Sequence, residues 1–144
     1  MDIYYGRRRD LDAVMEIERA SFTDAWSEEG VAASLEDPDG GLLAASEDGR
    51  LMGYAIFHCS FEDCELYSVA VSPACRRRGV GRELVSAVIH EARSRGASRL
   101  LLEVRRSNLP ARAMYDSMGF TAIGERKNYY DAPREDAVIM ELEL

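Results

Sequence analysis

Residues 69–92 read VAVSPACRRRGVGRELVSAVIHEA, and this stretch decides the fold. Its first residues have the apolar character of a strand, and Pro73 ends that strand because proline cannot donate a ladder hydrogen bond. After a basic, glycine-containing loop, apolar residues recur at the spacing of one helical face: Val80, Leu84, Val85, Val88, Ile89 and Ala92. A strand joined to an amphipathic helix by such a loop is typical of an α/β protein.

The loop between these two elements combines arginine and glycine at the start of a helix. Residues 76–82 hold four arginines and no acid. The first N–H groups of a helix lack main-chain partners, and glycine lets an anion approach the backbone, so the pattern predicts a diphosphate site. It is neither a Walker A loop, since no Gly-Lys-Ser/Thr follows, nor the dinucleotide-binding fingerprint, since the third glycine is absent. The alternative is a basic turn that binds nothing.

The sequence before this stretch predicts further strands and helices. Strands are expected over residues 3–5, 42–46, 51–59 and 65–71. Asp48-Gly49 is a hairpin signal between the second and third of them. Asp10 and Ser27 are expected to cap two helices, the second of which should end before Asp37-Pro38.

The sequence after this stretch completes the expected fold. Residues 99–105 are mostly apolar, which predicts a strand covered on both faces. Asn108 can cap a helix that ends near Gly119, and two last strands are expected near 120–126 and 137–144. We therefore expect a single domain over residues 1–144, with an α/β (α+β) fold and a mixed, mostly antiparallel central sheet flanked by helices.

The charge of the chain limits its partners. The 144 residues include 18 Lys and Arg against 26 Asp and Glu, a net charge of −8. This balance argues against direct nucleic-acid binding and against membrane binding, because those surfaces attract positive charge. Residues 10–48 concentrate twelve acids and one base. This segment is either a set of solvated helix faces or an acidic front for a basic partner.

The cysteines and the N-terminus indicate the compartment. Cys59, Cys64 and Cys75 have no zinc-ligand spacing, and no metal site is predicted. There is no charged-then-apolar leader, and no apolar run approaches the ~20 residues of a membrane span. We therefore expect a cytoplasmic protein with free thiols, although Cys59 and Cys64 could face each other across a hairpin.

Two residues in the last third of the chain are candidates for catalysis. Glu103 is the one acid within the apolar strand, and its alternative role is an ion pair with Arg105 or Arg126. Tyr115 follows Asn108 by two helical turns, so one helix face can present both side chains. A tyrosine on an amphipathic helix is alternatively a core residue.

These motifs together resemble the GCN-five-related N-acetyltransferases, and within them the RimI type, over nearly the whole chain. The family's Arg/Gln-x-x-Gly-x-Gly/Ala loop corresponds to Arg76–Gly81. The RimI-like pattern Glu-Val-Arg-x-Ser-Asn-x-x-Ala-x-x-x-Tyr corresponds to Glu103–Tyr115. Similarity to its C-terminal signature and its N-terminal substrate loop is found at residues 126–130, at residues 134–137, and at Phe22 and Trp26-Ser27.

The resemblance implies acetyl-CoA as co-substrate and no metal, with Glu103 as general base and Tyr115 as general acid. The residues implied to bind acetyl-CoA are Val69, Ala70, Val71, Arg76, Arg77, Arg78, Gly79, Val80, Gly81, Arg82 and Asn108. The residues implied to bind the acceptor are Phe22, Trp26, Tyr67, Tyr129 and Tyr130. The acceptor of the RimI type is the N-terminal alanine of small-subunit ribosomal protein eighteen, so the implied partner is a basic protein N-terminus.

Two other functions remain open. One is an acetyltransferase for lysine, a polyamine or another small amine, and the other is a catalytically silent acyl-CoA-binding module. The combination of Glu103, Tyr115 and Asn108 favours an enzyme over a silent module. The Phe22 and Trp26 loop favours a peptide over a small amine, as does the Asn128-Tyr129-Tyr130 run.

Overall fold

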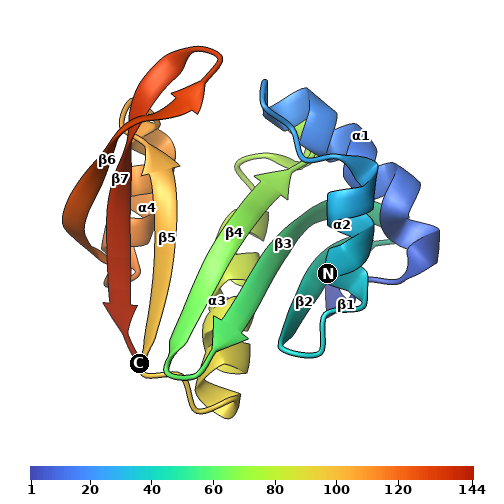
Figure 1. Cartoon of the computed structure of the whole chain (residues 1–144). Helices are drawn as coiled ribbons and strands as arrows, with labels where there is room; N and C mark the ends of the chain where they lie inside the picture. The colour runs from blue at the N-terminus through green and yellow to red at the C-terminus, as the bar shows by residue number, and fades with distance from the viewer.

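The computed structural model describes residues 1–144 as a seven-stranded sheet with four α-helices (Figure 1). The strands are β1 (Asp2–Tyr5), β2 (Gly40–Glu47), β3 (Arg50–Ser60), β4 (Asp63–Val71), β5 (Arg99–Arg105), β6 (Thr121–Asp131) and β7 (Arg134–Glu143). The helices are α1 (Leu11–Ser21), α2 (Glu28–Leu35), α3 (Val80–Ser94) and α4 (Leu109–Ser117), with short 3-10 turns at Arg8–Asp10 and Pro73–Cys75. None of the helices has both the length and the apolar character needed to cross a membrane.

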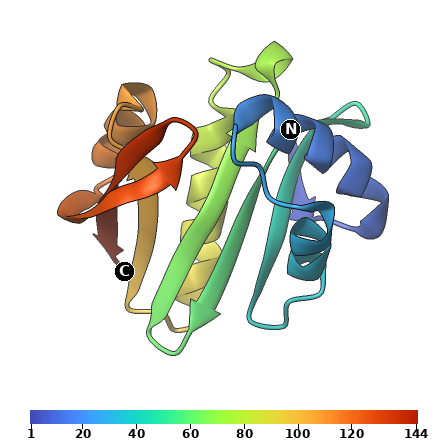
Figure 2. The ribbon, with the colours of Figure 1, turned by 45° about the horizontal axis from the view of Figure 1, so that its top comes forward.

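The strands lie in the order β1-β2-β3-β4-β5-β7-β6. Every neighbouring pair is antiparallel except β4 and β5, which α3 connects as a crossover. The predicted mixed, mostly antiparallel sheet is therefore confirmed. Helices α1 and α2 cover one face, here called the α1 face, and α3 and α4 cover the other, the α3 face (Figures 1 and 2).

Each face of the sheet has its own hydrophobic core. Alternation along β2 shows the division: Leu43 and Ala45 pack toward α3, whereas Leu42 and Ala44 pack toward α1 and α2. The larger core lies on the α3 face and includes the buried face of α3 that the sequence predicted.

Strand β5 is covered on one face only. Leu100, Leu102 and Val104 are buried on the α3 face, whereas Leu101 and Glu103 on the other face are half-exposed. The predicted coverage of this strand on both faces is wrong, because α1 and α2 pack against β2, β3 and β4. The half-open face of β5 is therefore available to a ligand.

Local signals for turns and caps were mostly correct. Asp48 and Gly49 both have positive φ in the β2–β3 turn, and the Ser27 side chain accepts a hydrogen bond from the Gly30 N–H at 3.0 Å. Asp10 does not cap α1 in this way. Its carboxylate reaches back to the Arg7 N–H at 2.8 Å and closes the 3-10 turn that precedes the helix.

Two of the three cysteines are not free. Cys59 and Cys64 lie opposite each other on β3 and β4 and are joined by a disulfide, with their Cα atoms 3.9 Å apart. Cys75 is a free thiol. The expectation of three free thiols is wrong because the hairpin register places the first two directly across from each other.

Candidate active site

Strands β4 and β5 pair only over their first residues. The parallel ladder runs from Asp63 opposite Arg99 to Leu66 opposite Leu102. Beyond this point the two strands diverge, and Figure 1 shows the green and orange arrows separating. The edge of β4 from Tyr67 to Val71 therefore has no main-chain partner on this side.

A β-bulge at Tyr67 marks the point of divergence. Ile56 of β3 pairs with Ser68 and Phe57 pairs with Leu66, so Tyr67 is the extra residue. An extra residue reverses the alternation of the side chains that follow it. Leu66 packs on the α3 face, whereas both Tyr67 and Ser68 turn to the α1 face.

The open edge of β4 carries free main-chain donors. The Ser72 N–H donates to the Met52 carbonyl at 2.8 Å, which is toward β3. Successive N–H groups of a strand point to opposite edges. The Ala70 N–H therefore also points toward β3, and the N–H groups of Val69 and Val71 point into the opening. Donors placed this way suit an extended ligand or a developing oxyanion.

The predicted anion loop has free main-chain donors as well. No N–H group from Arg76 to Arg82 donates a hydrogen bond to the protein backbone. Arg77 and Gly79 have φ of 65° and 79°, and such left-handed residues turn successive N–H groups toward one side. The loop lines a cavity of ≈ 340 Å³ together with Val71 and Met114. The residues present therefore fit a diphosphate held mainly by the backbone.

The arginine side chains of this loop contribute less than the sequence suggested. Arg76, Arg78 and Arg82 contact the Val71 carbonyl at 3.4 Å, Glu47 at 2.5 Å and Ser117 Oγ at 2.6 Å, respectively. Only Arg77 leaves its guanidinium without a partner in the protein. The anion loop, defined as Arg76–Arg82, therefore offers one free cation and a set of backbone donors.

Glu103 lies directly beyond the last β4–β5 pair and faces the α1 side. Its carboxylate accepts a hydrogen bond from Arg126 Nε at 2.9 Å, so the alternative of an ion pair with Arg126 is confirmed. The Arg126 side chain is 56% exposed, and exposed pairs contribute only ~0–1 kcal/mol, so a ligand can displace it. The Glu103 carboxylate raises the pKa of Tyr129 to about 12, and the Arg126 guanidinium that bonds Glu103 lies 5.9 Å from the Tyr129 ring centroid.

Trp26 and Tyr67 form an aromatic wall on the α1 face beside the opening. Their ring centroids are 5.9 Å apart, and Tyr67 stacks on His58 at 6.3 Å with nearly parallel rings. The structure thus brings together two of the implied acceptor residues. Phe22, like Trp26, packs against the core formed with α1 and α2, but it has no ring contact with this wall.

A buried carboxylate that the sequence analysis did not single out supports this wall. Glu18 of α1 is 1% exposed and accepts hydrogen bonds from the Trp26 N–H at 3.0 Å, from the Tyr54 hydroxyl and from the Ser68 hydroxyl at 3.5 Å. Several donors are needed because a buried carboxylate without partners is costly. The available signal was its position four residues after Val14, on the buried stripe of the helix.

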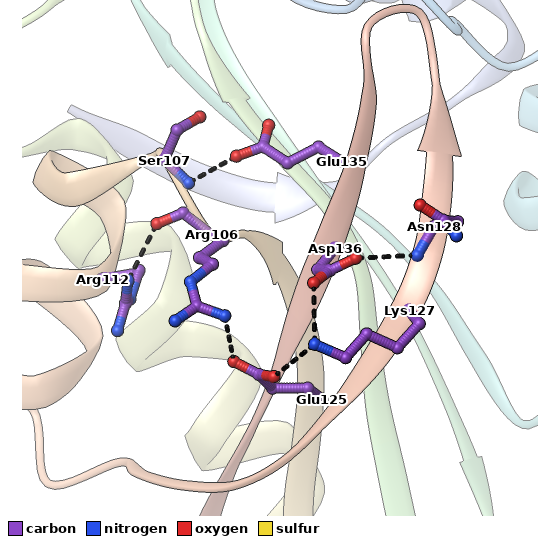
Figure 3. Close-up of polar contacts among 8 residues, drawn as sticks. All are labelled: Arg106, Ser107, Arg112, Glu125, Lys127, Asn128, Glu135 and Asp136. Carbon is purple, nitrogen blue, oxygen red and sulfur yellow. Dashed lines mark hydrogen bonds and ion pairs between the residues drawn. The ribbon is translucent and has the colours of Figure 1, made fainter.

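A second bulge places the C-terminal tyrosines. Residues 126–130 of β6 face only residues 135–137 of β7, and Asn128 has a φ of 53°. The Asp136 carboxylate holds this segment by accepting from the Asn128 N–H at 2.8 Å and from Lys127 Nζ at 3.2 Å (Figure 3). These contacts fix both tyrosines of the segment beside the opening.

Arg105 connects the loop after α1 to the β6–β7 turn. Its guanidinium contacts the Pro133 carbonyl at 2.8 Å, Glu135 at 3.3 Å, Asp24 at 3.7 Å and the Tyr130 ring centroid at 4.3 Å. Thr23 adds a direct hydrogen bond to the Ala132 carbonyl. Figure 2 shows the tip of the β6–β7 hairpin beside this loop. The α1 side of the opening is therefore bordered by two connected loops.

Tyr115 lies on the α3 face, where α4 packs. Its ring is 5% exposed and meets the Phe120 ring edge-on, so the alternative of a core tyrosine is confirmed for the ring. The Tyr115 hydroxyl makes no hydrogen bond within the protein. Only Ser21 Oγ is both buried and without a partner, so the Tyr115 hydroxyl is not fully buried. The hydroxyl therefore reaches accessible space. Burial raises the pKa of Tyr115 well above its usual value, which keeps the hydroxyl protonated.

Asn108 begins the helix that carries Tyr115. Its side-chain oxygen accepts a hydrogen bond from the Ala111 N–H at 3.3 Å, so the predicted helix cap is confirmed. The next turn supplies Pro110 and Met114 to the cavity of the anion loop. Asn108 itself does not line that cavity, and its side-chain amide nitrogen has no partner in the protein.

Residues 11–120 match the sequence model of the acetyltransferase (GNAT) family. The chain belongs to this family. A relative from Haemophilus ducreyi, named a ribosomal protein bS18-alanine N-acetyltransferase, is 37% identical over 139 residues, which cover 94% of this chain and 95% of that protein.

Solved GNAT structures agree with the sequence comparison. A ribosomal-protein-S18-alanine N-acetyltransferase from Escherichia coli superposes with a TM-score of 0.90 at 35% identity, covering 99% of this chain and 92% of that one. A Salmonella typhimurium protein described as an acetyltransferase, solved with its cofactor acetyl-CoA, superposes with a TM-score of 0.87 at 25% identity, covering 100% and 94%. The GNAT protein described here is an acetyl-CoA-dependent N-acetyltransferase, as the sequence motifs implied.

Proposed function

We propose that this GNAT enzyme acetylates a protein N-terminus, at the N-terminal alanine of small-subunit ribosomal protein eighteen, in the cytoplasm. The names of its relatives support this acceptor. One structural observation carries the proposal. The divergence of β4 and β5 puts the Glu103 carboxylate and the free N–H groups of Val69 and Val71 at one opening.

The binding residues for acetyl-CoA follow from the free backbone donors. The anion loop would hold the diphosphate, the open edge of β4 would pair with the extended arm, and Asn108 would contact that arm from α4. Acetyl-CoA supplies the thioester whose acetyl group is transferred. The N–H groups of Val69 and Val71 would stabilise the oxyanion that forms at its carbonyl.

The acceptor amine must lose a proton before it attacks. An α-amine has a pKa of about 7.7–8, so a nearby carboxylate can complete this step near neutral pH. Glu103 would take that proton, directly or through a water, after the amine displaces the exposed Arg126 side chain. The nitrogen then bonds to the acetyl carbon as the carbon–sulfur bond breaks, the Tyr115 hydroxyl would protonate the departing thiolate, and the second proton lost by the nitrogen would restore that hydroxyl. We propose direct transfer without an acyl-enzyme.

The border of the opening supports a peptide acceptor. Trp26 and Tyr67 offer an aromatic wall on one side, and Tyr129 and Tyr130 lie on the other. The Arg105 contacts connect the loop after α1 to the β6–β7 turn, which leaves a narrow approach suited to a chain end.

An acceptor panel tests the proposal. Purified protein would be incubated with acetyl-CoA and an alanine-initiated peptide from the ribosomal protein, a lysine peptide with a blocked N-terminus, or spermidine. Mass spectrometry should find one acetyl group on the alanine-initiated peptide alone. Acetylation only of the lysine peptide or spermidine would refute the proposed acceptor, and acetyl-CoA binding without any product would indicate a silent binding module. A trapped acetyl-cysteine at Cys75 would refute direct transfer.

A further inference from the structure

We infer that Glu65, together with the exposed rings of Tyr67 and Tyr129, binds a positively charged side chain of the acceptor peptide close to its N-terminus. This inference rests on the proposed function, since it assigns a second contact to the same acceptor. It concerns a side chain of the peptide, lysine or arginine, and not the amine that is acetylated.

The register of the sheet places Glu65 on the acceptor side. Glu65 lies opposite Leu101 in the short β4–β5 ladder. The following pair, Leu66 and Leu102, is buried on the α3 face, so Glu65 and Leu101 face the α1 side. Glu103 is two residues further along β5 on that same face. The Glu65 position is therefore roughly 7 Å along the strand from Glu103, at ~3.3 Å per residue.

Glu65 is an exposed carboxylate without a partner in the protein. Acids near it are paired: Asp37 with His58 at 2.7 Å, Asp63 with Arg99 at 2.8 Å, and Glu103 with Arg126 at 2.9 Å. No hydrogen bond or ion pair reaches the Glu65 carboxylate, whose main chain is paired in the sheet. Its charge is therefore available to a ligand, whereas the other acids would first have to break an existing pair.

Two exposed tyrosines flank this carboxylate. Tyr67 is 46% exposed and lies two residues after Glu65 on β4, whereas Tyr129 is 50% exposed and lies beside Arg126, the partner of Glu103 on β5. Burial, followed by the charge of Glu65, raises the pKa of Tyr67, and the Glu65 charge also acts on Tyr129 after the larger effect of Glu103. The carboxylate therefore lies within electrostatic range of both rings.

A carboxylate flanked by aromatic rings recognises a cation. The ring faces attract a guanidinium or an ammonium group, and the carboxylate neutralises its charge. The Tyr67 ring faces the same side as Glu65 because it lies two residues further along β4, and the bulge turns Ser68 to that face as well. The separation from Glu103 matches a side chain within the first few residues after the reacting amine, because an extended peptide advances ~3.3 Å per residue.

Steady-state kinetics with matched peptides tests this inference. Alanine-initiated peptides of one length would carry a single arginine at position 2, 3, 4 or 5, or none, in a neutral background. We expect one arginine position to raise kcat/KM roughly fivefold over the neutral peptide at low salt. Glu65→Gln should abolish that preference without changing the KM for acetyl-CoA. Salt at 0.5 M should reduce it in the wild type.

Glu62→Gln is the matched control, because it removes the same charge from the same hairpin without removing the group between the tyrosines. The control should keep the arginine preference. An equal loss in both variants would mean that only the overall charge matters, and equal preference in the wild type and Glu65→Gln would also overturn the inference. If no alanine-initiated peptide is acetylated at all, the proposed function fails instead.

Discussion

Glu103 and Tyr115 lie on opposite faces of the sheet, on the two sides of the opening between β4 and β5. Glu103 faces the α1 side with the aromatic wall, and Tyr115 packs on the α3 side, where the cavity of the anion loop lies. In the proposed mechanism, the acceptor and acetyl-CoA therefore approach from different faces. Each binding step can be altered by substitutions that leave the other intact.

The roles of the two residues can be tested with substitutions that keep their shape. Glu103→Gln and Tyr115→Phe should each lower kcat by about 100-fold, the lower range for loss of a general base or acid. Tyr115→Phe keeps the buried ring, so the fold should persist. Calorimetric titration should show unchanged acetyl-CoA binding in both variants. Unchanged turnover in both would refute the assigned roles.

The contribution of Gly79 to acetyl-CoA binding can be measured separately from its contribution to stability. Gly79 and Gly49 both have positive φ, and the space around each is open. Alanine at either site should cost about 1 kcal/mol of unfolding free energy, because a Cβ disfavours the left-handed region. Only Gly79→Ala should raise the KM for acetyl-CoA, since Gly49 lies in the β2–β3 turn. Urea unfolding and steady-state kinetics measure the two effects, and equal KM values would contradict a phosphate role for the loop.

Features that depend on neighbouring residues could be predicted from the sequence. The helix that follows the anion loop, its glycine start and the Ser27 and Asn108 caps all arise from contacts within a few residues. The bulge at Tyr67 could not be predicted, because it depends on which residue of β3 pairs with which residue of β4. The exposure of one face of β5 likewise depends on where α1 and α2 pack.

Charge counts along the chain also had limited meaning. The acidic segment 10–48 is not one surface, because Glu18 is fully buried, Asp37 pairs with His58, and Glu47 pairs with Arg78 of the anion loop. Glu65, which the sequence analysis passed over, is the unpaired acid beside the opening. The sequence shows how many charged residues a segment contains, but only the folded structure determines which of them have partners.

The effect of Glu103 on the pKa of Tyr129 can be measured. Hydrogen bonding to the Glu103 carboxylate favours the protonated phenol and raises the pKa of Tyr129 to about 12. Glu103→Gln should lower this pKa toward the usual value of about 10. Because the folded-state pKa is raised, the contact stabilises the fold below pH ~10 and this contribution is lost as pH rises through ~12. Nuclear magnetic resonance of 13C-labelled tyrosine measures the titration, and an unchanged pKa would contradict the contact.

The disulfide can be tested by counting thiols. Unfolded, unreduced protein should react with one equivalent of iodoacetamide, at Cys75, and with three after reduction. Reduction should lower the unfolding free energy by about 2 kcal/mol, since the closed loop is short. The double variant Cys59→Ser, Cys64→Ser should match the reduced protein and should not respond to reductant. Three reactive thiols without reduction would show that the pair is open.

Arg105 offers a test of whether the border of the opening selects a chain end. Arg105→Ala removes the contacts to Asp24, Glu135 and the β6–β7 turn and leaves the Thr23 bond to the Ala132 carbonyl, so the connection between the two loops should loosen. We expect the KM for the alanine-initiated peptide to rise roughly tenfold, the loss expected for a charged group with several hydrogen bonds. Acetylation of the lysine peptide should become detectable. Arg105→Lys should recover little, because lysine cannot reproduce the planar set of donors.

Arg134→Ala is the matched control for this substitution, since it removes an exposed arginine without an ion pair from the same hairpin. Hydrogen exchange of residues 131–134 should accelerate in Arg105→Ala and stay unchanged in Arg134→Ala. Faster exchange without any change in acceptor preference would mean that the connected loops stabilise the hairpin but do not select the acceptor. If hydrogen exchange and acceptor preference both change in Arg105→Ala, then the width of the approach that Arg105 sets selects a chain end.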